Sequence, residues 1–199
     1  MTVRIVTDSA SDLTPGEAEA LGVDIVPLSI RFGEEVFLDR EELDVEEFYR
    51  RMASSEDLPQ TAAPAPGAFQ EVFRRRFAEG ADAIVCINLS SGVSATMESS
   101  ELAAREVDGD VRVVDSRSVT AGLGVMVQAA AQAAARGAST DEVVTLVEGM
   151  RDRTRVFGAI DTLENLKKGG RIGNAQALLG SMLSIKPLID ISSGVVEEA

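Results

Sequence analysis

Ala83-Ile84-Val85-Cys86-Ile87, followed by Leu89-Ser90-Ser91-Gly92-Val93-Ser94-Ala95-Thr96, is the stretch that decides the fold of this chain. Its first part is a short apolar run rich in β-branched residues, which is typical of a β-strand. Its second part is a hydroxyl-rich turn that leads into a helical pattern reaching residue 106. A strand, a turn and a helix in this order predict one unit of an α/β sheet.

The same alternation extends outward from this unit toward both ends of the chain. Strand-like runs occupy residues 3–7, 24–30, 111–114 and 156–160, and helical patterns occupy residues 15–21, 45–52, 96–106, 122–136 and 140–153. Ser139 and Glu142 form a capping box at the start of the last helix. Residues 28–32 and 35–38 are expected to pair as a hairpin that ornaments the sheet. We therefore predict an α/β fold in which helices sandwich a parallel sheet.

The pattern changes after residue 160. Short helical patterns at 162–168 and 175–183 are separated by glycines, and strand-like pieces at 188–191 and 195–197 flank a turn at 192–194. An isolated hairpin is marginally stable in water. We expect residues 1–155 to form one α/β domain, and residues 156–199 to be the start of a second α/β domain that is incomplete because the chain is truncated.

Charge and hydropathy exclude several classes of function. The chain has 199 residues, with 19 Lys+Arg and 33 Asp+Glu, for a net charge of −14. This balance argues against a nucleic-acid surface and against more than transient contact with anionic membranes, because both need positive charge. The chain does not start with an apolar signal core, and no run reaches the roughly 20 apolar residues of a spanning helix, so we expect a cytoplasmic protein.

Catalytic side chains are scarce, whereas hydrogen-bond donors are plentiful. The sequence has no histidine, one cysteine and no glycine-rich nucleotide loop. Cys86 lies in the apolar run and is expected to be a buried, inert thiol. The turn at residues 89–96 combines several hydroxyls with a helix N-terminus, where backbone N–H groups favour anions. The residues therefore favour a site that holds an anion, without a metal or a cofactor.

Four loops at strand ends carry the candidate site residues, because ligands of α/β sheets gather at the carboxyl ends of the strands. In the first loop, Asp8 follows a strand and could belong to a metal or phosphoryl site. We prefer the interpretation that Asp8 and Ser9 organise the turn through hydrogen bonds from their side chains to the backbone. Asp115-Ser116 repeats this pair after another strand and is interpreted as architectural.

The second loop carries Thr61 on a segment that Pro64 and Pro66 keep stiff and extended. Thr61 is either a preorganised hydrogen-bond donor or an exposed residue of a plain connector.

The third loop is the hydroxyl-rich turn, in which Ser94 is expected as the N-cap of the next helix. This capping role does not explain the hydroxyls of Ser90, Ser91 and Thr96. The fourth is Leu166-Lys167-Lys168-Gly169-Gly170-Arg171-Ile172, where the lysines fit a helix C-terminus and Arg171 lies beyond it.

Taken together and in this order, the loops resemble those of the DegV family. The resemblance covers essentially the whole chain, from Thr7-Asp8-Ser9-Ala10-Ser11-Asp12-Leu13 to Ile185-Lys186-Pro187. It implies a bacterial, non-catalytic lipid-binding protein that encloses one long-chain fatty acid between two domains. It further implies that a separate ATP-using fatty acid kinase subunit phosphorylates the exposed carboxyl group.

The resemblance also assigns roles to particular residues. Thr61 and Ser94 match the hydroxyls that hold the carboxylate, and Arg171 matches an arginine that faces the kinase. Ser90, Ser91, Gly92, Ala95 and Thr96 then form the supporting loop. Candidate residues for an apolar tunnel around the acyl chain, which are equally ordinary core residues, are Phe157, Ile160, Leu178, Leu179, Met182, Leu183 and Ile185.

Two alternatives stay open on the sequence. One is a metal-dependent phosphoryl-transfer enzyme that uses Asp8, Asp12 and Asp115. The other is a nonfunctional or purely interacting truncated fragment, which would expose apolar surface.

Overall fold

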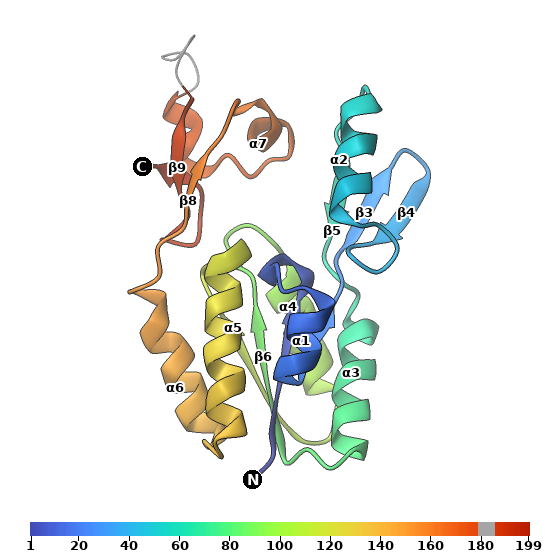
Figure 1. Ribbon diagram of the computed structural model, residues 1–199, viewed down its shortest axis with the longest axis vertical. Coiled ribbons are helices and arrows are strands. Elements are labelled where there is room, and N and C mark those ends of the chain that lie inside the picture. Colours follow the sequence, from blue (N-terminus) through green and yellow to red (C-terminus); the bar gives the residue numbers. More distant parts are fainter. Residues whose placement is uncertain (179–185) are drawn as a thin grey trace.

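The computed structural model describes residues 1–178 and 186–199 and contains a four-stranded parallel sheet (Figure 1). The strands lie in the order β2 (Val23–Val26), β1 (Val3–Asp8), β6 (Ala83–Asn88) and β7 (Asp110–Asp115). All three strand pairs are parallel. From β1 the chain adds β2 on one side and later β6 on the other, so the strand order reverses between β1 and β6.

Helices cover both faces of this sheet, which confirms the predicted α/β fold. One face carries α1 (Pro15–Leu21), α5 (Thr120–Ala135) and α6 (Thr140–Arg151), and the other carries α3 (Pro66–Ala78) and α4 (Thr96–Arg105).

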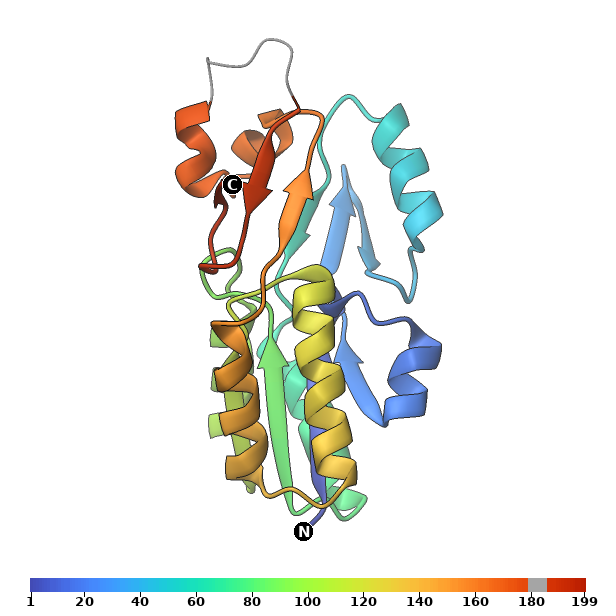
Figure 2. The same ribbon diagram turned by 60° about the vertical axis from the view of Figure 1, so that its left-hand side comes forward.

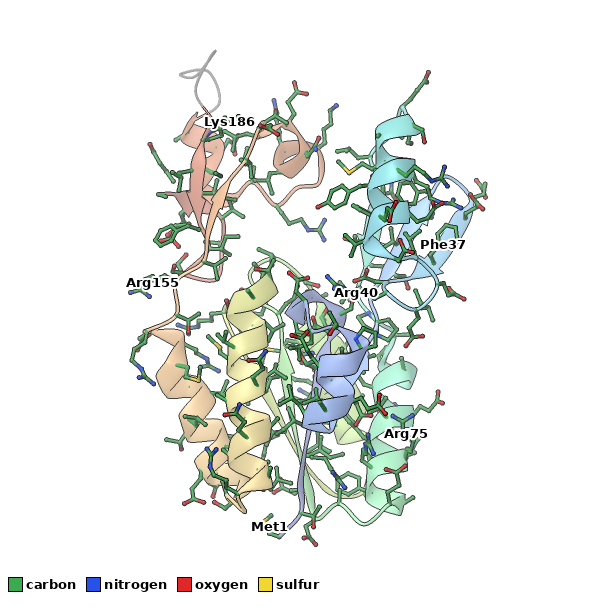
Figure 3. All side chains as sticks on the ribbon, viewed as in Figure 1. Met1, Phe37, Arg40, Arg75, Arg155 and Lys186 are labelled. Atoms are coloured by element: carbon green, nitrogen blue, oxygen red, sulfur yellow. The ribbon has the colours of Figure 1, made fainter. Side chains whose placement is uncertain are left out.

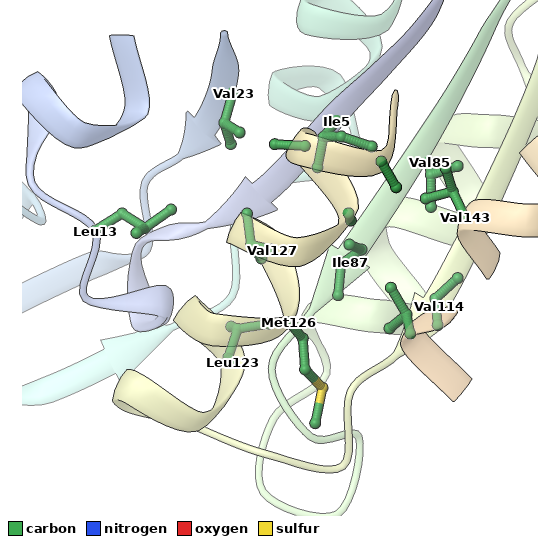
Figure 4. Close-up of a cluster of buried hydrophobic side chains, with 14 of the residues drawn as sticks. Ile5, Leu13, Val23, Val85, Ile87, Val114, Leu123, Met126, Val127 and Val143 are labelled. Atoms are coloured by element: carbon green, nitrogen blue, oxygen red, sulfur yellow. The ribbon is translucent and has the colours of Figure 1, made fainter. Parts of the chain in front are cut away.

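Side chains of the central strands alternate between these two faces. Val85 and Ile87 join the α5 side of the core, shown in Figure 4, while Ile84 and Cys86 join the α3 side with Phe69. Every residue of β6 is buried. Burying one such aliphatic side chain contributes about 1.5–3 kcal/mol, so the apolar run that predicted the fold also supplies much of its core energy.

Local sequence explains how the helices begin and how closely they approach. The predicted capping box at α6 is present, with Ser139 Oγ accepting from Glu142 N at 3.3 Å and Glu142 Oε2 accepting from Ser139 N at 2.8 Å. In α5, a Cβ on Gly124 would lie 2.6 Å from the carbonyl oxygen of Ser11. Only glycine permits this helix to lie so close to the short 3-10 helix η1 (Ser9–Ser11).

Residues 29–62 form a separate small lobe, which we call the N-terminal lobe. It contains β3 (Ser29–Phe32), β4 (Glu35–Leu38), α2 (Val45–Ser54) and β5 (Gln60–Ala62). The predicted hairpin is confirmed, but it is part of its own antiparallel sheet with the order β4-β3-β5. The strand expected at 24–30 is therefore split in two, with the break at Pro27, which has no N–H to donate. Tyr49 on α2 is 63% exposed.

Residues 156–178 and 186–199 form a second small lobe, the C-terminal lobe. Its elements are β8 (Phe157–Ala159), α7 (Glu164–Lys168), η2 (Gly173–Leu178), β9 (Leu188–Asp190) and β10 (Glu197–Glu198). The predicted C-terminal hairpin is present as β9 and β10, and β8 adds a third antiparallel strand to it. The helix expected at 175–183 is a 3-10 helix over its first residues, and the remainder lies outside the described residues.

Both lobes rise from the same end of the parallel sheet, where its strands have their carboxyl ends (Figures 1 and 2). This is the end at which the sequence places its candidate loops. Among the described residues, no helix has the length and apolar character needed to cross a membrane.

Candidate functional site

A cleft of about 860 Å³ lies between the two lobes. The N-terminal lobe lines it with Arg31, Gly33, Glu56, Asp57, Leu58, Pro59, Gln60 and Thr61, and the C-terminal lobe with Asn165, Leu166, Lys168, Gly169 and Arg171. Thr61 is exposed and lies at the centre of β5, opposite Ile30 of β3. The structure thus brings Thr61 and Arg171 to one cleft from positions far apart in the chain.

Ser90 and Ser91 use their hydroxyls within the protein. Ser90 is buried, donates to the carbonyl of Gly194 and accepts from Gly92 N at 3.2 Å. Ser91 donates to Asp115 Oδ2 at 2.6 Å. These two serines join the turn at residues 89–96, hereafter the serine loop, to its neighbours.

Gly92 makes the closest approach between the serine loop and the C-terminal lobe. A Cβ at this position would lie 2.6 Å from the carbonyl oxygen of Gly194 and 2.7 Å from Val195 Cγ1. The serine loop is therefore the surface on which the turn before β10 docks. The sequence offered no signal for this role, because Gly194 is more than a hundred residues away.

Ser94, Ala95 and Thr96 form the start of α4. The helix begins at Thr96 with Ala95 as its N-cap, so the expected capping position of Ser94 is wrong by one residue. Ser94 Oγ instead accepts from Thr96 N at 3.3 Å and pairs with Thr96 Oγ1 at 2.9 Å. Thr96 is buried, whereas Ser94 is half-buried and lines a separate hollow of about 350 Å³ with Ser91, Ala95, Met97, Glu98 and Glu101.

Arg171 connects the cleft to the serine loop. Its Nε donates to the carbonyl of Val93 at 3.2 Å, and its Nη1 donates to the carbonyl of Gly169 at 2.7 Å. Val93 directly precedes Ser94, so Arg171 holds the backbone beside that hydroxyl. Lys167 and Lys168 have a different role from that of Arg171. They lie in the last turn of α7, where positive charge stabilises the helix C-terminus.

Asp8 lies at the reversal of strand order between β1 and β6. Its buried carboxylate accepts from Leu89 N at 2.8 Å, from Ala10 N at 3.0 Å and from Asn88 Nδ2 at 3.2 Å. Burial raises the pKa of Asp8 from 3.8 to about 6, against the lowering effect of these hydrogen bonds. Asp8 organises the turn as expected, and it also anchors the first residue of the serine loop.

The other aspartates of the phosphoryl-transfer alternative have different partners. Asp12 forms an ion pair with Arg40 at 2.5 Å, and burial raises its pKa. Asp115 accepts from Ser91 and from Arg117 N at 2.8 Å, the architectural role expected for it. Over residues 1–178 and 186–199, no group of three or more His, Cys, Asp or Glu side chains is placed to hold a metal ion.

The candidate tunnel residues have mixed surroundings. Phe157 is 58% exposed on β8, whereas Ile160 packs on the buried cluster of the C-terminal lobe, which contains Leu163, Ile172, Ala175, Ile189 and Val196. Leu178 ends η2, and Leu179, Met182, Leu183 and Ile185 lie outside the described residues.

Cys86 is buried, as expected, and burial raises the pKa of its thiol far above the ordinary value. A protonated thiol is a poor nucleophile. Arg31 and Gln60 were missed by the sequence reasoning. They line the cleft beside Thr61 and hydrogen-bond to each other across β3 and β5, a pairing that no local pattern reveals.

Comparison with known proteins places this geometry in a family. Residues 2–199 match the model of the family described as "Uncharacterised protein, DegV family". A DegV domain-containing protein from Deinococcus radiodurans is 38% identical over 197 residues, which are 99% of this chain and 70% of that protein. One from Streptomyces coelicolor is 37% identical over 195 residues, 98% of this chain and 69% of that protein.

Solved structures of similar proteins lead to the same family. A DegV family protein from Thermus thermophilus, described as fatty acid binding, superposes with a TM-score of 0.92 at 38% identity, over 100% of this chain and 71% of that chain. A stearic acid-binding protein from Eubacterium ventriosum gives 0.89 at 28% identity, over 99% and 69%. DegV from Bacillus subtilis, described as a fatty acid binding protein, gives 0.88 at 30% identity, over 100% and 71%. The chain belongs to the DegV family.

Proposed function

We propose that this protein binds a long-chain fatty acid, holds its carboxylate with Thr61 and Ser94, and presents it to a separate kinase subunit. The observation that carries the proposal is the shared cleft of Thr61 and Arg171, with Arg171 bonded to the backbone next to Ser94. The fatty acid binding described for the Thermus and Bacillus relatives supports the choice of ligand.

The chemistry of the hydroxyls suits a carboxylate. A carboxylate removed from water needs donors, and charge-assisted hydrogen bonds from fixed hydroxyls are stronger than neutral ones. The backbone of β5 holds Thr61 in place. In the Ser94–Thr96 pair either oxygen can be the donor, so Ser94 can accept from Thr96 and donate its own proton to the ligand.

A presenting role also suits the rest of the chain. The sequence contains no histidine, and its one cysteine is buried with a raised pKa. In this proposal the protein supplies binding and orientation, and a kinase subunit supplies ATP and catalysis. The exposed Arg171 would then be available to the kinase as a fixed cation.

The first test is to identify the lipid by mass spectrometry of extracts from natively purified protein. We expect about one long-chain fatty acid per protein. After delipidation, Thr61→Val and Ser94→Ala should each weaken rebinding by about tenfold or more, since a hydrogen bond to a charged group contributes about 1.5–3 kcal/mol. Thr145→Val, at an exposed threonine of α6, is the matched control. Absence of copurified lipid, together with no rebinding, would contradict the proposal.

The second test concerns Arg171. Acyl-phosphate formation can be trapped with hydroxylamine in a mixture of the loaded protein, ATP and a bacterial fatty acid kinase subunit. Arg171→Ala should lower the rate by a larger factor than it lowers the amount of bound lipid, measured in the same sample, and Lys168→Ala on the same wall of the cleft should have a smaller effect on the rate. Equal rates for the wild type and Arg171→Ala would reject a kinase-facing role for this arginine.

A further inference from the structure

A second polar hollow lies where the C-terminal lobe joins the parallel layer, away from Thr61. It has a volume of about 440 Å³ and is lined by Arg117, Arg151, Asp152, Arg155, Asp190, Ser192, Ser193 and Glu197. We call it the arginine hollow. Arg117 follows β7 and Arg151 ends α6, while Arg155, labelled in Figure 3, lies in the connection to β8.

The three arginines form few direct ion pairs, although carboxylates line the same hollow: the Ser192 hydrogen bond and, to a smaller extent, the charge of Arg155 lower the pKa of Asp190. Among the described residues, Arg117 and Arg155 form no ion pair; Arg155 donates only to backbone carbonyls, those of Asp152 at 3.0 Å and Thr154 at 3.2 Å. Arg151 is 3.7 Å from Glu148, and its buried Nε has no hydrogen-bond partner. Each guanidinium therefore keeps donors to offer.

Two of the three carboxylates in the hollow are already engaged. Asp190 Oδ1 accepts from Ser192 N at 2.7 Å and also from the Ser192 hydroxyl, and Glu197 Oε1 accepts from Asn174 Nδ2 at 3.0 Å. Asp152 is the C-cap residue of α6. The hollow thus holds three guanidinium groups and three carboxylates, and the donors that it offers to a ligand are the remaining guanidinium N–H groups and the Ser193 hydroxyl.

Arg117 adds a backbone feature. It has a φ of 51°, a left-handed conformation that costs energy in a residue other than glycine. Its N–H donates to Asp115 Oδ1 at 2.8 Å, which holds it in that conformation. The parallel layer therefore fixes the base of this arginine beside the turn of Ser192 and Ser193.

We propose that the arginine hollow binds a phosphate group. A phosphate offers several acceptor oxygens and more than one negative charge, and the planar guanidinium of arginine matches it in bidentate geometry. The hydroxyl of Ser193 is a further donor. Because the walls come from both the parallel layer and the C-terminal lobe, bound phosphate would tie these two parts together. This site is independent of the fatty acid function proposed above.

The test uses the intact protein and inorganic phosphate, titrated by calorimetry at constant ionic strength. We expect saturable binding near one phosphate per chain and a rise in Tm, because a ligand that binds only the folded state stabilises it. Arg155→Gln should weaken phosphate binding by about tenfold, the loss of one charge-assisted interaction. Its side chain is exposed, so the variant should fold.

Arg74→Gln is the matched control, since Arg74 is an exposed arginine on α3 that donates to a backbone carbonyl. A parallel titration with glycerol 3-phosphate separates the two sources of the group: tighter binding than inorganic phosphate assigns a phosphate ester, and weaker binding assigns free phosphate. Lack of saturable binding of either compound in the millimolar range overturns the proposal, as does equal weakening by Arg74→Gln.

Discussion

At the scale of single residues, Asp8 shows how a strand-tip carboxylate can be structural. Its three N–H donors come from η1, from β6 and from the serine loop. The sequence predicted that Asp8 organises its own turn, because that bond spans two residues. The bond to Leu89 spans 81 positions and follows only from the pairing of β1 with β6.

The raised pKa of Asp8 predicts a pH-dependent stability. Its folded pKa of about 6 exceeds the unfolded value of 3.8, so the folded state binds more protons between these values, and the contribution of Asp8 to stability falls as the pH rises. From pH 4.5 to 7.5 this loss amounts to about 2 kcal/mol. Urea unfolding of wild type and Asp8→Asn at both pH values measures it.

We expect Asp8→Asn to be destabilising, and more so at pH 4.5 than at pH 7.5, since all other carboxylates cancel in the comparison. Asp44→Asn, which alters an exposed N-cap of α2, is the control. If Asp8→Asn lowers the free energy of unfolding by the same amount at both pH values, the pKa of Asp8 is not raised in the folded state.

At the scale of elements, the position of the serine loop was predicted from the sequence, whereas the hydrogen-bond partners of its side chains were not. Its composition identified a turn followed by a helix, and both are present. Ser90 and Ser91 were expected in a supporting loop, and their hydroxyls donate to the Gly194 carbonyl and to Asp115. These two partners lie far along the chain and cannot be found from residues 89–96 alone.

Gly92→Ala tests the docking role of this loop. The added methyl would overlap the Gly194 carbonyl, and overpacking of this kind costs about 1–3 kcal/mol. Gly67→Ala, at a helical glycine with open space around it, should have a small effect. Urea unfolding compares the stabilities, and hydrogen exchange should show faster exchange around residues 192–196 in Gly92→Ala alone. Unchanged exchange there would argue against docking.

At the scale of the whole molecule, the alternating pattern was sufficient to predict the parallel sheet, because buried runs such as β6 and capped helices such as α6 are local signals. The two small antiparallel sheets were harder to predict from the sequence. Thr61 was expected on an extended segment, but its pairing with Ile30 requires a contact 31 positions away. The cleft exists only once both lobes are folded.

The domain boundary predicted at residue 155 is a hypothesis that fragments of the chain can test. Over the described residues, the two clusters of the parallel layer involve residues before 155, and the third lies within the C-terminal lobe. We expect a fragment of residues 1–155 to unfold cooperatively. A fragment of residues 156–199 should lack stable structure, because the cluster in its described part, residues 156–178 and 186–199, has five buried residues. Circular dichroism of both fragments checks this, and an unfolded 1–155 fragment would show that the boundary is misplaced.

The exposed aromatic ring on α2 has a practical consequence. Tyr49 is the only tyrosine of the sequence, and there is no tryptophan. The tyrosine fluorescence of the protein therefore comes from one helix of the N-terminal lobe, with the Phe48 ring 5.3 Å away as its edge-on neighbour. Quenching of that emission by iodide reports how accessible this lobe is, and the protein thus carries its own optical probe without any label.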